Sequence, residues 1–288
     1  MPGGRNMDFK KFSELIMIEQ TFFAFPFALL GVLFAGGGTV KTWFWVIVAL
    51  AAARTAGMSF NRVIDAKIDG KNPRTRDRLV PKGAVGPSVV WMTAVISSLM
   101  LVGASFMLNS LCFYLSFPAV LMLFTYSYFK RFSASSHFYL GLVEAAAPIG
   151  GYIAVTGEFG RVPLVLGLVI LTWIAGLDIV YAIQDMDFDV KEDLHSIPVR
   201  LGRKKALVIS AACYIGSIGA MIYAGLLTHK NVPYWTAVLL VGIIFFYQQK
   251  LARRKNIALA VKNFFKVNMY ISPILFFGTL TDVLLGQI

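Results

Sequence analysis

The chain has 288 residues, of which 57% are hydrophobic and only 15% are charged, whereas a soluble domain carries roughly 25% charged residues. This composition excludes an ordinary water-soluble globule and indicates a membrane protein. The formal net charge of the chain is +12. In so apolar a chain, basic residues usually lie in loops that face the cytoplasmic leaflet, so we expect no nucleic-acid partner. The 2 cysteines lie in apolar runs and indicate neither a disulfide framework nor a Cys-rich metal site.

Nine apolar stretches are long enough to be membrane-spanning helices, each of which needs about 20 residues. They cover residues 20–37, 42–60, 87–108, 110–128, 138–156, 162–183, 206–227, 232–249 and 267–286. A count of eight or ten stays open, because the junctions near residues 38–41 and 109 are tight. We expect one all-α membrane domain over residues 1–288, with no cleaved signal segment at its N-terminus.

The distribution of Lys and Arg predicts the orientation of these helices. Basic residues gather before the first stretch and after the second, fourth, sixth and eighth stretches. On the opposite side lie Lys41, Arg161 and Lys230, while Arg54 lies within the second stretch. The positive-inside rule therefore places the N-terminus in the cytoplasm and the C-terminus outside.

Most acidic residues fall in two short regions, which follow the second and sixth stretches. They are Asp65, Asp69 and Asp77 in the first region, and Asp178, Asp185, Asp187, Asp189, Glu192 and Asp193 in the second. Both regions lie where an even-numbered helix emerges on the basic side, four stretches apart. This matched position predicts a parallel four-helix unit that is used twice, with a ninth helix added.

The spacing within the two regions predicts two rows of oxygen ligands. Asn61, Asp65 and Asp69 are four residues apart and share one helical face. If the sixth helix continues, a second row forms from Asp178, Asp185, Asp189 and Asp193. Like charges at this spacing repel, so a cation is expected, and Mg²⁺ is typically held by one or two carboxylates together with substrate phosphates. The alternative interpretation is that both regions are merely solvated helix ends.

Basic residues complete a predicted anion site. RTRDRLVPKG at 74–83 follows the first acidic region, and YSYFKR at 126–131 closes the fourth stretch on the same side. A substrate that binds divalent metal and several cationic groups is most simply a polyphosphate anion. The positive-inside bias alone explains most of these basic residues, Arg74 in particular, whereas Arg78 and Lys130 are candidates for substrate contact.

Three motifs resemble those of the UbiA superfamily of membrane prenyltransferases, in its 4-hydroxybenzoate polyprenyltransferase branch. They are Asn-x-x-x-Asp-x-x-x-Asp at 61–69, Tyr-x-x-x-Lys-Arg at 126–131 and Tyr-x-x-x-Asp-x-x-x-Asp at 181–189. RLVPKG at 78–83 resembles the family's Arg-Pro-Leu-x-x-Gly, with Leu79 in place of the proline. The resemblance implies a ring of nine helices around a central cavity that opens to membrane lipid, in the inner membrane of a bacterium.

The resemblance also implies a reaction, the transfer of a polyprenyl group from polyprenyl diphosphate to an aromatic acid in quinone biosynthesis. The implied catalytic residues and Mg²⁺ ligands are Asp65, Asp69, Asp185 and Asp189, assisted by Asn61. The implied contacts of the diphosphate and of the allylic cation are Arg78, Lys130, Lys191, Tyr126 and Tyr181. The acceptor is either 4-hydroxybenzoate, for ubiquinone, or a dihydroxynaphthoate, for menaquinone, and the sequence does not separate the two.

Some ionisable residues depart from the helix-end pattern or from the family motifs. Glu144 and Asp178 lie inside apolar stretches, where we expect them to line the acceptor cavity rather than make structural hydrogen bonds. Arg54 is expected either to orient the first motif and its substrate or to pair with an acid. His195 stands where the family commonly has a lysine, so contact with an anion there would depend on its protonation.

Two other functional classes fit the sequence less well. The CDP-alcohol phosphatidyltransferases have Asp-Gly-x-x-Ala-Arg, whereas here Asp69-Gly70 is followed by Lys71, Asn72, Pro73 and Arg74, so the pattern fails. A divalent-cation transporter would place its acids near the bilayer midplane. Because both acidic regions lie at helix ends, prenyl transfer is favoured over transport.

Overall fold

The computed structural model describes residues 7–254 and 257–286, and every regular element within these ranges is helical. The longer helices are α2 (Ile18–Phe34), α3 (Val40–Ile64), α5 (Pro87–Leu108), α6 (Ser110–Phe129), α7 (Ser136–Thr156), α8 (Arg161–Ala182), α10 (Ile197–Leu227), α11 (Val232–Ala252) and α13 (Ile271–Leu285). The shorter elements are α1 (Phe9–Ile16), α4 (Ala66–Lys71), the 3₁₀ turn η1 (Ile183–Asp185), α9 (Met186–Lys191) and α12 (Ile257–Asn268).

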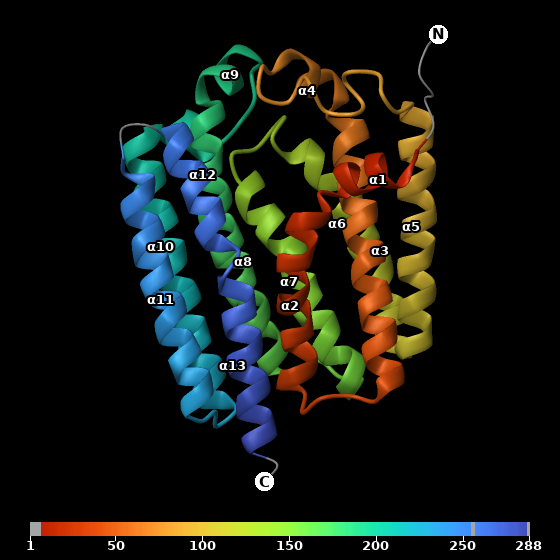
Figure 1. Ribbon diagram of the computed structural model, residues 1–288, viewed down its shortest axis with the longest axis vertical. Coiled ribbons are helices and arrows are strands. Elements are labelled where there is room, and N and C mark those ends of the chain that lie inside the picture. The colour runs from red at the N-terminus through yellow and green to blue at the C-terminus, as the bar shows by residue number, and fades with distance from the viewer. Residues whose placement is uncertain (1–6, 255–256, 287–288) are drawn as a thin grey trace.

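The long helices run along one common direction, as expected for a membrane bundle (Figure 1). Within the described residues, 8 helical segments are long and apolar enough to cross a membrane, from α3 to a last segment, Val261–Leu285, that combines α12 and α13. The first predicted stretch corresponds to α2, whose apolar part covers only Phe25–Phe34. The all-helical, multi-span membrane fold is therefore confirmed, while the count of nine spans stays a prediction.

The helices pack in a closed order. Each of α3, α5, α6, α7, α8, α10, α11, α13 and α2 contacts the next, and α2 returns to α3. This order agrees with the ring that the family resemblance implies. α2 also contacts α7 and α8, so it connects parts of the ring that are distant in this order.

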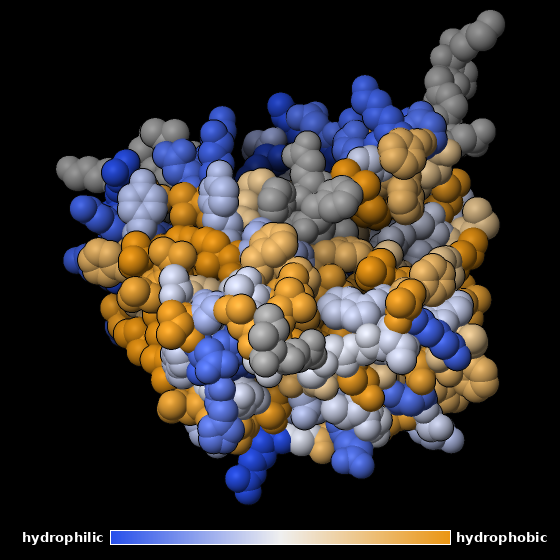
Figure 2. Space-filling view, turned by 60° about the horizontal axis from the view of Figure 1, so that its bottom comes forward, coloured by the Kyte–Doolittle hydropathy of each residue, from blue (hydrophilic) through white to orange (hydrophobic). Residues whose placement is uncertain are grey.

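Apolar side chains cover the flank of the bundle. Figure 2 shows orange side chains over much of the visible face, most continuously at its left, with a row of blue residues along the upper edge and further blue and white ones towards the bottom. Large side chains such as Phe106, Leu121 and Phe246 are exposed on the helices. Lipid tails are as apolar as these side chains, so their exposure indicates a surface that faces the membrane.

α7 and α8 approach each other closely through a glycine. A Cβ atom added at Gly141 would lie only 2.3 Å from the carbonyl oxygen of Leu171. Small residues permit such close backbone contact between membrane helices. The contact lies about one turn from the start of α7, and it brings that end of α7 against α8 near the predicted site.

Both acidic regions lie at a break between a long helix and a short one. α3 ends before Asp65 and α4 follows, while α8 ends at Ala182 and is followed by η1 and α9. Figure 1 shows α4 and α9 together at one end of the bundle. The second row of acids therefore follows a helical segment that is interrupted by a 3₁₀ turn and ends before Asp193. Asp193 has a φ angle of 54° and ends this row as an exposed turn residue.

Candidate active site

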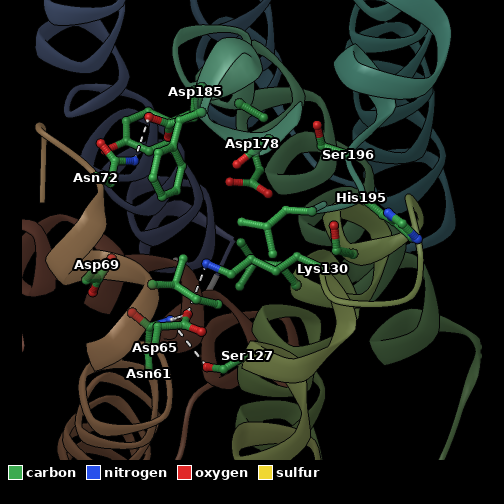
Figure 3. Close-up of a pocket in the computed structure, with 18 of the residues that line it drawn as sticks. Asn61, Asp65, Asp69, Asn72, Ser127, Lys130, Asp178, Asp185, His195 and Ser196 are labelled. Carbon is green, nitrogen blue, oxygen red and sulfur yellow. Dashed lines mark hydrogen bonds and ion pairs between the residues drawn. The ribbon is translucent and has the colours of Figure 1, made fainter. Parts of the chain in front are cut away.

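A cavity of about 240 Å³ lies beside α4 and α9, at the end of the bundle that these helices cover. Its polar lining consists of Asn61, Asp65, Asp69, Asn72, Arg74, Arg78, Tyr126, Ser127, Lys130, Ser136, His137, Asp178, Tyr181, Asp185, Asp189, His195 and Ser196. In Figure 3, Asp65 and Asp69 lie on one side, Asp178 and Asp185 lie on the opposite side, and Lys130 extends between them. The structure thus brings both acidic regions to one cavity.

Asp65 is buried at the junction of α3 and α4, where two cations face its carboxylate. Lys130 Nζ lies 3.2 Å from Asp65 Oδ2, and an Arg131 nitrogen lies 3.3 Å from Oδ1. Asn61, one turn earlier on α3, donates a 2.9 Å hydrogen bond to Oδ2 and a second one, of 3.2 Å, to Ser127 Oγ. These contacts attach the end of α6, which carries Ser127 and is followed directly by Lys130, to the first acidic motif.

Asp69 is held by the loop that follows α4. Arg78 donates a 2.7 Å hydrogen bond to Asp69 Oδ2. The Thr75 hydroxyl donates to the backbone carbonyl of Asp69 at 3.0 Å, which fixes the loop against α4. Charge-assisted hydrogen bonds of this kind are stronger than neutral ones, so Arg78 holds the second carboxylate of the first motif in place.

Asp185 makes a two-pronged contact with Arg74. Arg74 Nε lies 2.9 Å from Asp185 Oδ1, and its terminal nitrogen lies 2.7 Å from Oδ2. Arg74 also donates to the Tyr181 hydroxyl, and Asn72 donates to Asp185 Oδ1 at 3.3 Å. Burial disfavours the charged guanidinium, but the hydrogen bond with Asp185 and nearby negative charge outweigh it and raise the pKa of Arg74 above its usual value.

Arg74 therefore does more than follow the positive-inside bias, which was its expected explanation. It reaches from the loop after α4 to the end of α8, and so joins the two halves of the chain across the cavity. Its fork of N–H groups suits a carboxylate bidentately. Neither helical periodicity nor a family motif marks this contact in the sequence.

The donor set of the cavity fits a hard divalent cation. Four carboxylates, from Asp65, Asp69, Asp185 and Asp189, line it together with the amide of Asn61. Among the described residues, no three His, Cys, Asp or Glu side chains form a group that could hold a metal by themselves. Mg²⁺ does not require such a group, because one or two carboxylates and substrate phosphates commonly complete its shell.

Two residues with predicted substrate contacts lie outside the cavity lining. Lys191 is exposed at the end of α9, and Arg54 lies 3.7 Å from Glu144, which connects α3 with α7. The position of Arg54 agrees with the alternative that it pairs with an acid. Tyr126 and Tyr181 both line the cavity, as does His195, whose backbone N–H donates to the Lys130 carbonyl at 2.7 Å.

The sequence pattern of the UbiA prenyltransferase family matches residues 24–271. The chain therefore belongs to the UbiA prenyltransferase family, and the resemblance inferred from its three motifs is confirmed. Among curated relatives, the 4-hydroxybenzoate octaprenyltransferase of Pectobacterium carotovorum subsp. carotovorum (strain PC1) is 27% identical over 85% of this chain and 86% of that protein. The protein of the same name from Nitrosomonas eutropha (strain DSM 101675 / C91 / Nm57) is 29% identical over 89% and 90%.

Solved structures of the family share the fold. The apo structure of a UbiA homologue from Aeropyrum pernix K1 has a TM-score of 0.85 and 29% sequence identity, covering 92% of this chain and 98% of that one. A UbiA homologue from Archaeoglobus fulgidus, bound to GPP and Mg²⁺, has a TM-score of 0.71 at 14% identity, covering 93% and 99%. The similarity extends over nearly the whole chain in both cases.

Proposed function

We propose that this protein transfers a polyprenyl group from a polyprenyl diphosphate to an aromatic acid of the 4-hydroxybenzoate type, in quinone biosynthesis. The observation that carries the proposal is the meeting of two acidic motifs, distant in the sequence, at one cavity that also contains Arg74, Arg78 and Lys130. The curated relatives, whose names give this activity, support it. The names of these relatives include neither cation transport nor a dihydroxynaphthoate acceptor, so they favour neither alternative.

The cavity residues divide between metal and diphosphate. Asp65, Asp69, Asp185 and Asp189 would hold Mg²⁺, with Asn61 assisting, and the metal would supply charge neutralisation for a diphosphate leaving group. Arg74, Arg78 and Lys130 form ion pairs with three of these carboxylates. Once the carboxylates turn to metal, the same three cations would donate hydrogen bonds to phosphate oxygens.

The proposed reaction breaks the allylic C–O bond and forms a C–C bond to the aromatic ring. The diphosphate leaves with the electron pair of the C–O bond, and the ring carbon beside the phenolic hydroxyl attacks the allylic carbon. The products are the prenylated acid, diphosphate and a proton. Tyr126 and Tyr181 line the cavity, where an aromatic face near the allylic cation would contribute about 0.5–2 kcal/mol.

The membrane setting suits a substrate that is apolar at one end and charged at the other. The isoprenoid tail would remain in lipid beside the apolar flank, while the diphosphate binds at the polar end. We place that end in the cytoplasm, because most Lys and Arg lie there, and the protein in the inner membrane of a bacterium. The whole chain, residues 1–288, would act as one catalytic domain.

A turnover assay with purified protein tests the proposal. With Mg²⁺, a polyprenyl diphosphate and 4-hydroxybenzoate, mass spectrometry should detect the prenylated acid, and EDTA should abolish it until Mg²⁺ is restored. A parallel reaction with 1,4-dihydroxy-2-naphthoate compares the second acceptor. Undiminished turnover in EDTA, or no product with 4-hydroxybenzoate, would contradict the proposal.

A further inference from the structure

A buried histidine contacts an aspartate that faces the active-site cavity. His137, at the start of α7, has only 3% of its side chain exposed, and its Nδ1 lies 2.7 Å from Oδ2 of Asp178 on α8. Asp178 keeps 27% of its side chain exposed and lines the cavity. The four carboxylates proposed to bind metal do not include Asp178, which lies about two helical turns before Asp185.

The backbone determines which nitrogen of His137 carries the proton. The N–H of Ile197, at the start of α10, donates a 3.2 Å hydrogen bond to His137 Nε2. Nε2 must therefore be the unprotonated nitrogen, so Nδ1 carries the hydrogen and donates to Asp178. Both ring nitrogens are used, and a partner on a different helix holds each of them. A hydrogen bond at one nitrogen of a histidine commonly sets its tautomer and orientation in this way.

The contact leaves one oxygen of Asp178 available to a ligand. Oδ2 accepts from His137, whereas Oδ1 makes no hydrogen bond or ion pair with any residue that the structure describes. An ionised carboxylate only accepts hydrogen bonds. It would therefore repel the carboxylate of an aromatic acid and attract the hydroxyl at the other end of such a molecule.

We propose that Asp178 accepts a hydrogen bond from the phenolic hydroxyl of the aromatic acceptor, and that His137 is a positioning residue that aims the Asp178 carboxylate into the cavity. This inference rests on the proposed function, which supplies a phenolic acceptor. The reacting ring carbon is next to that hydroxyl. Holding the hydroxyl therefore positions the nucleophile, and a hydrogen bond to a carboxylate increases the electron density of the ring.

Two substitutions of His137 distinguish a role in positioning Asp178 from a role in packing alone. In His137→Asn the amide nitrogen takes a place close to that of Nδ1 and can still donate to Asp178. In His137→Gln the amide oxygen reaches the place of Nε2, so it can accept from Ile197, but the donor to Asp178 is lost. The readouts are kcat and the separate KM values for the aromatic acid and for the polyprenyl diphosphate, with thermal unfolding in detergent to compare folding.

We expect His137→Gln and Asp178→Asn to raise the KM for the aromatic acid about ten-fold or more, with an unchanged KM for the diphosphate. His137→Asn should stay within about three-fold of the wild type. Equal effects of the two histidine variants, or an equal rise in both KM values, would overturn the inference, because packing alone predicts them.

A binding measurement separates this inference from the proposed function. By calorimetry with Mg²⁺ and inorganic diphosphate present, the wild-type protein should bind 4-hydroxybenzoate at least about ten-fold more tightly than benzoate, which lacks the hydroxyl. His137→Gln should lose this preference and His137→Asn should keep it. A preference without turnover would contradict the proposed function alone, whereas turnover by a wild-type protein without the preference would contradict the role of Asp178 and His137 alone.

Discussion

The two acidic regions occupy matched places in the fold but differ in how their charge is balanced. In the first region the Asp65 and Asp69 side chains are 2% and 7% exposed, and their cations, Lys130, Arg131 and Arg78, come from the same half of the chain. In the second region Asp185 is 15% exposed, and its cation, Arg74, comes from the other half. The two regions, each at the end of a long helix, therefore differ in their ion pairs although they have similar places in the chain.

The difference indicates that the second acidic region depends on the first half of the chain for the cation that balances Asp185. Arg74 crosses the cavity and contacts both Asp185 and the ring of Tyr181, 4.9 Å from its centroid. Lys71 and Glu192 form a second ion pair between α4 and the end of α9. The loop after α4 thus connects the two halves of the site, and it carries a cation that we propose contacts the diphosphate.

The largest predicted effect is the loss of turnover when a carboxylate of the second region is neutralised. Asp185→Asn removes a proposed metal ligand, and metal stabilisation of a leaving group contributes several kcal/mol, so kcat should fall at least about 100-fold. Asp187→Asn is a matched control, because Asp187 lies two residues further on, exposed on α9 and outside the cavity lining. Equal activities of the two variants would contradict the assignment of Asp185.

A smaller effect is expected when the connection across the cavity is removed. Arg74→Ala should raise the KM for the polyprenyl diphosphate about ten-fold, because a charge-assisted hydrogen bond contributes about 1.5–3 kcal/mol. Arg74→Lys should raise this KM less than Arg74→Ala does, but it should not restore the wild-type value, since lysine lacks the bidentate fork. Arg76→Ala, in the same loop but outside the cavity lining, should leave the KM unchanged. If Arg76→Ala raises the KM as much as Arg74→Ala does, the general charge of the loop explains the effect.

The sequence predicts the helical fold and the meeting of the two acidic regions, but not the contacts between them. Four-residue spacing and helix ends are local features, so Asp65, Asp69, Asp185 and Asp189 could be identified without coordinates. Arg74 and His137 contact partners on other helices, with no periodic relation to them. The sixth helix continues through the 3₁₀ turn η1 into α9 and ends at Lys191, so Asp178, Asp185 and Asp189 line the cavity while Asp193 lies beyond the helix.

The smallest predicted effect distinguishes two lysines that the family resemblance treats alike. Lys130 lines the cavity 3.2 Å from Asp65, whereas Lys191 is exposed at the end of α9 and outside the lining. Lys130→Ala should raise the KM for the diphosphate about five- to ten-fold, because the cation lies within reach of a phosphate at the site. Lys191→Ala should change it less than about two-fold, since solvent screens an exposed charge.

Salt dependence checks the origin of any effect at Lys191. Lys191 could change the KM only through long-range attraction of the anionic diphosphate. In that case the effect of Lys191→Ala on the KM should disappear when the ionic strength rises from about 0.01 M to 1 M, because the screening length falls from about 30 Å to 3 Å. The effect of Lys130→Ala should persist at both ionic strengths, because a partly buried cation in direct contact is screened less. A large, salt-independent rise of the KM in Lys191→Ala would instead mean that α9 moves inward when the diphosphate binds, so that Lys191 contacts the anion. The second acidic region would then resemble the first, because it too would have a cation from its own half of the chain.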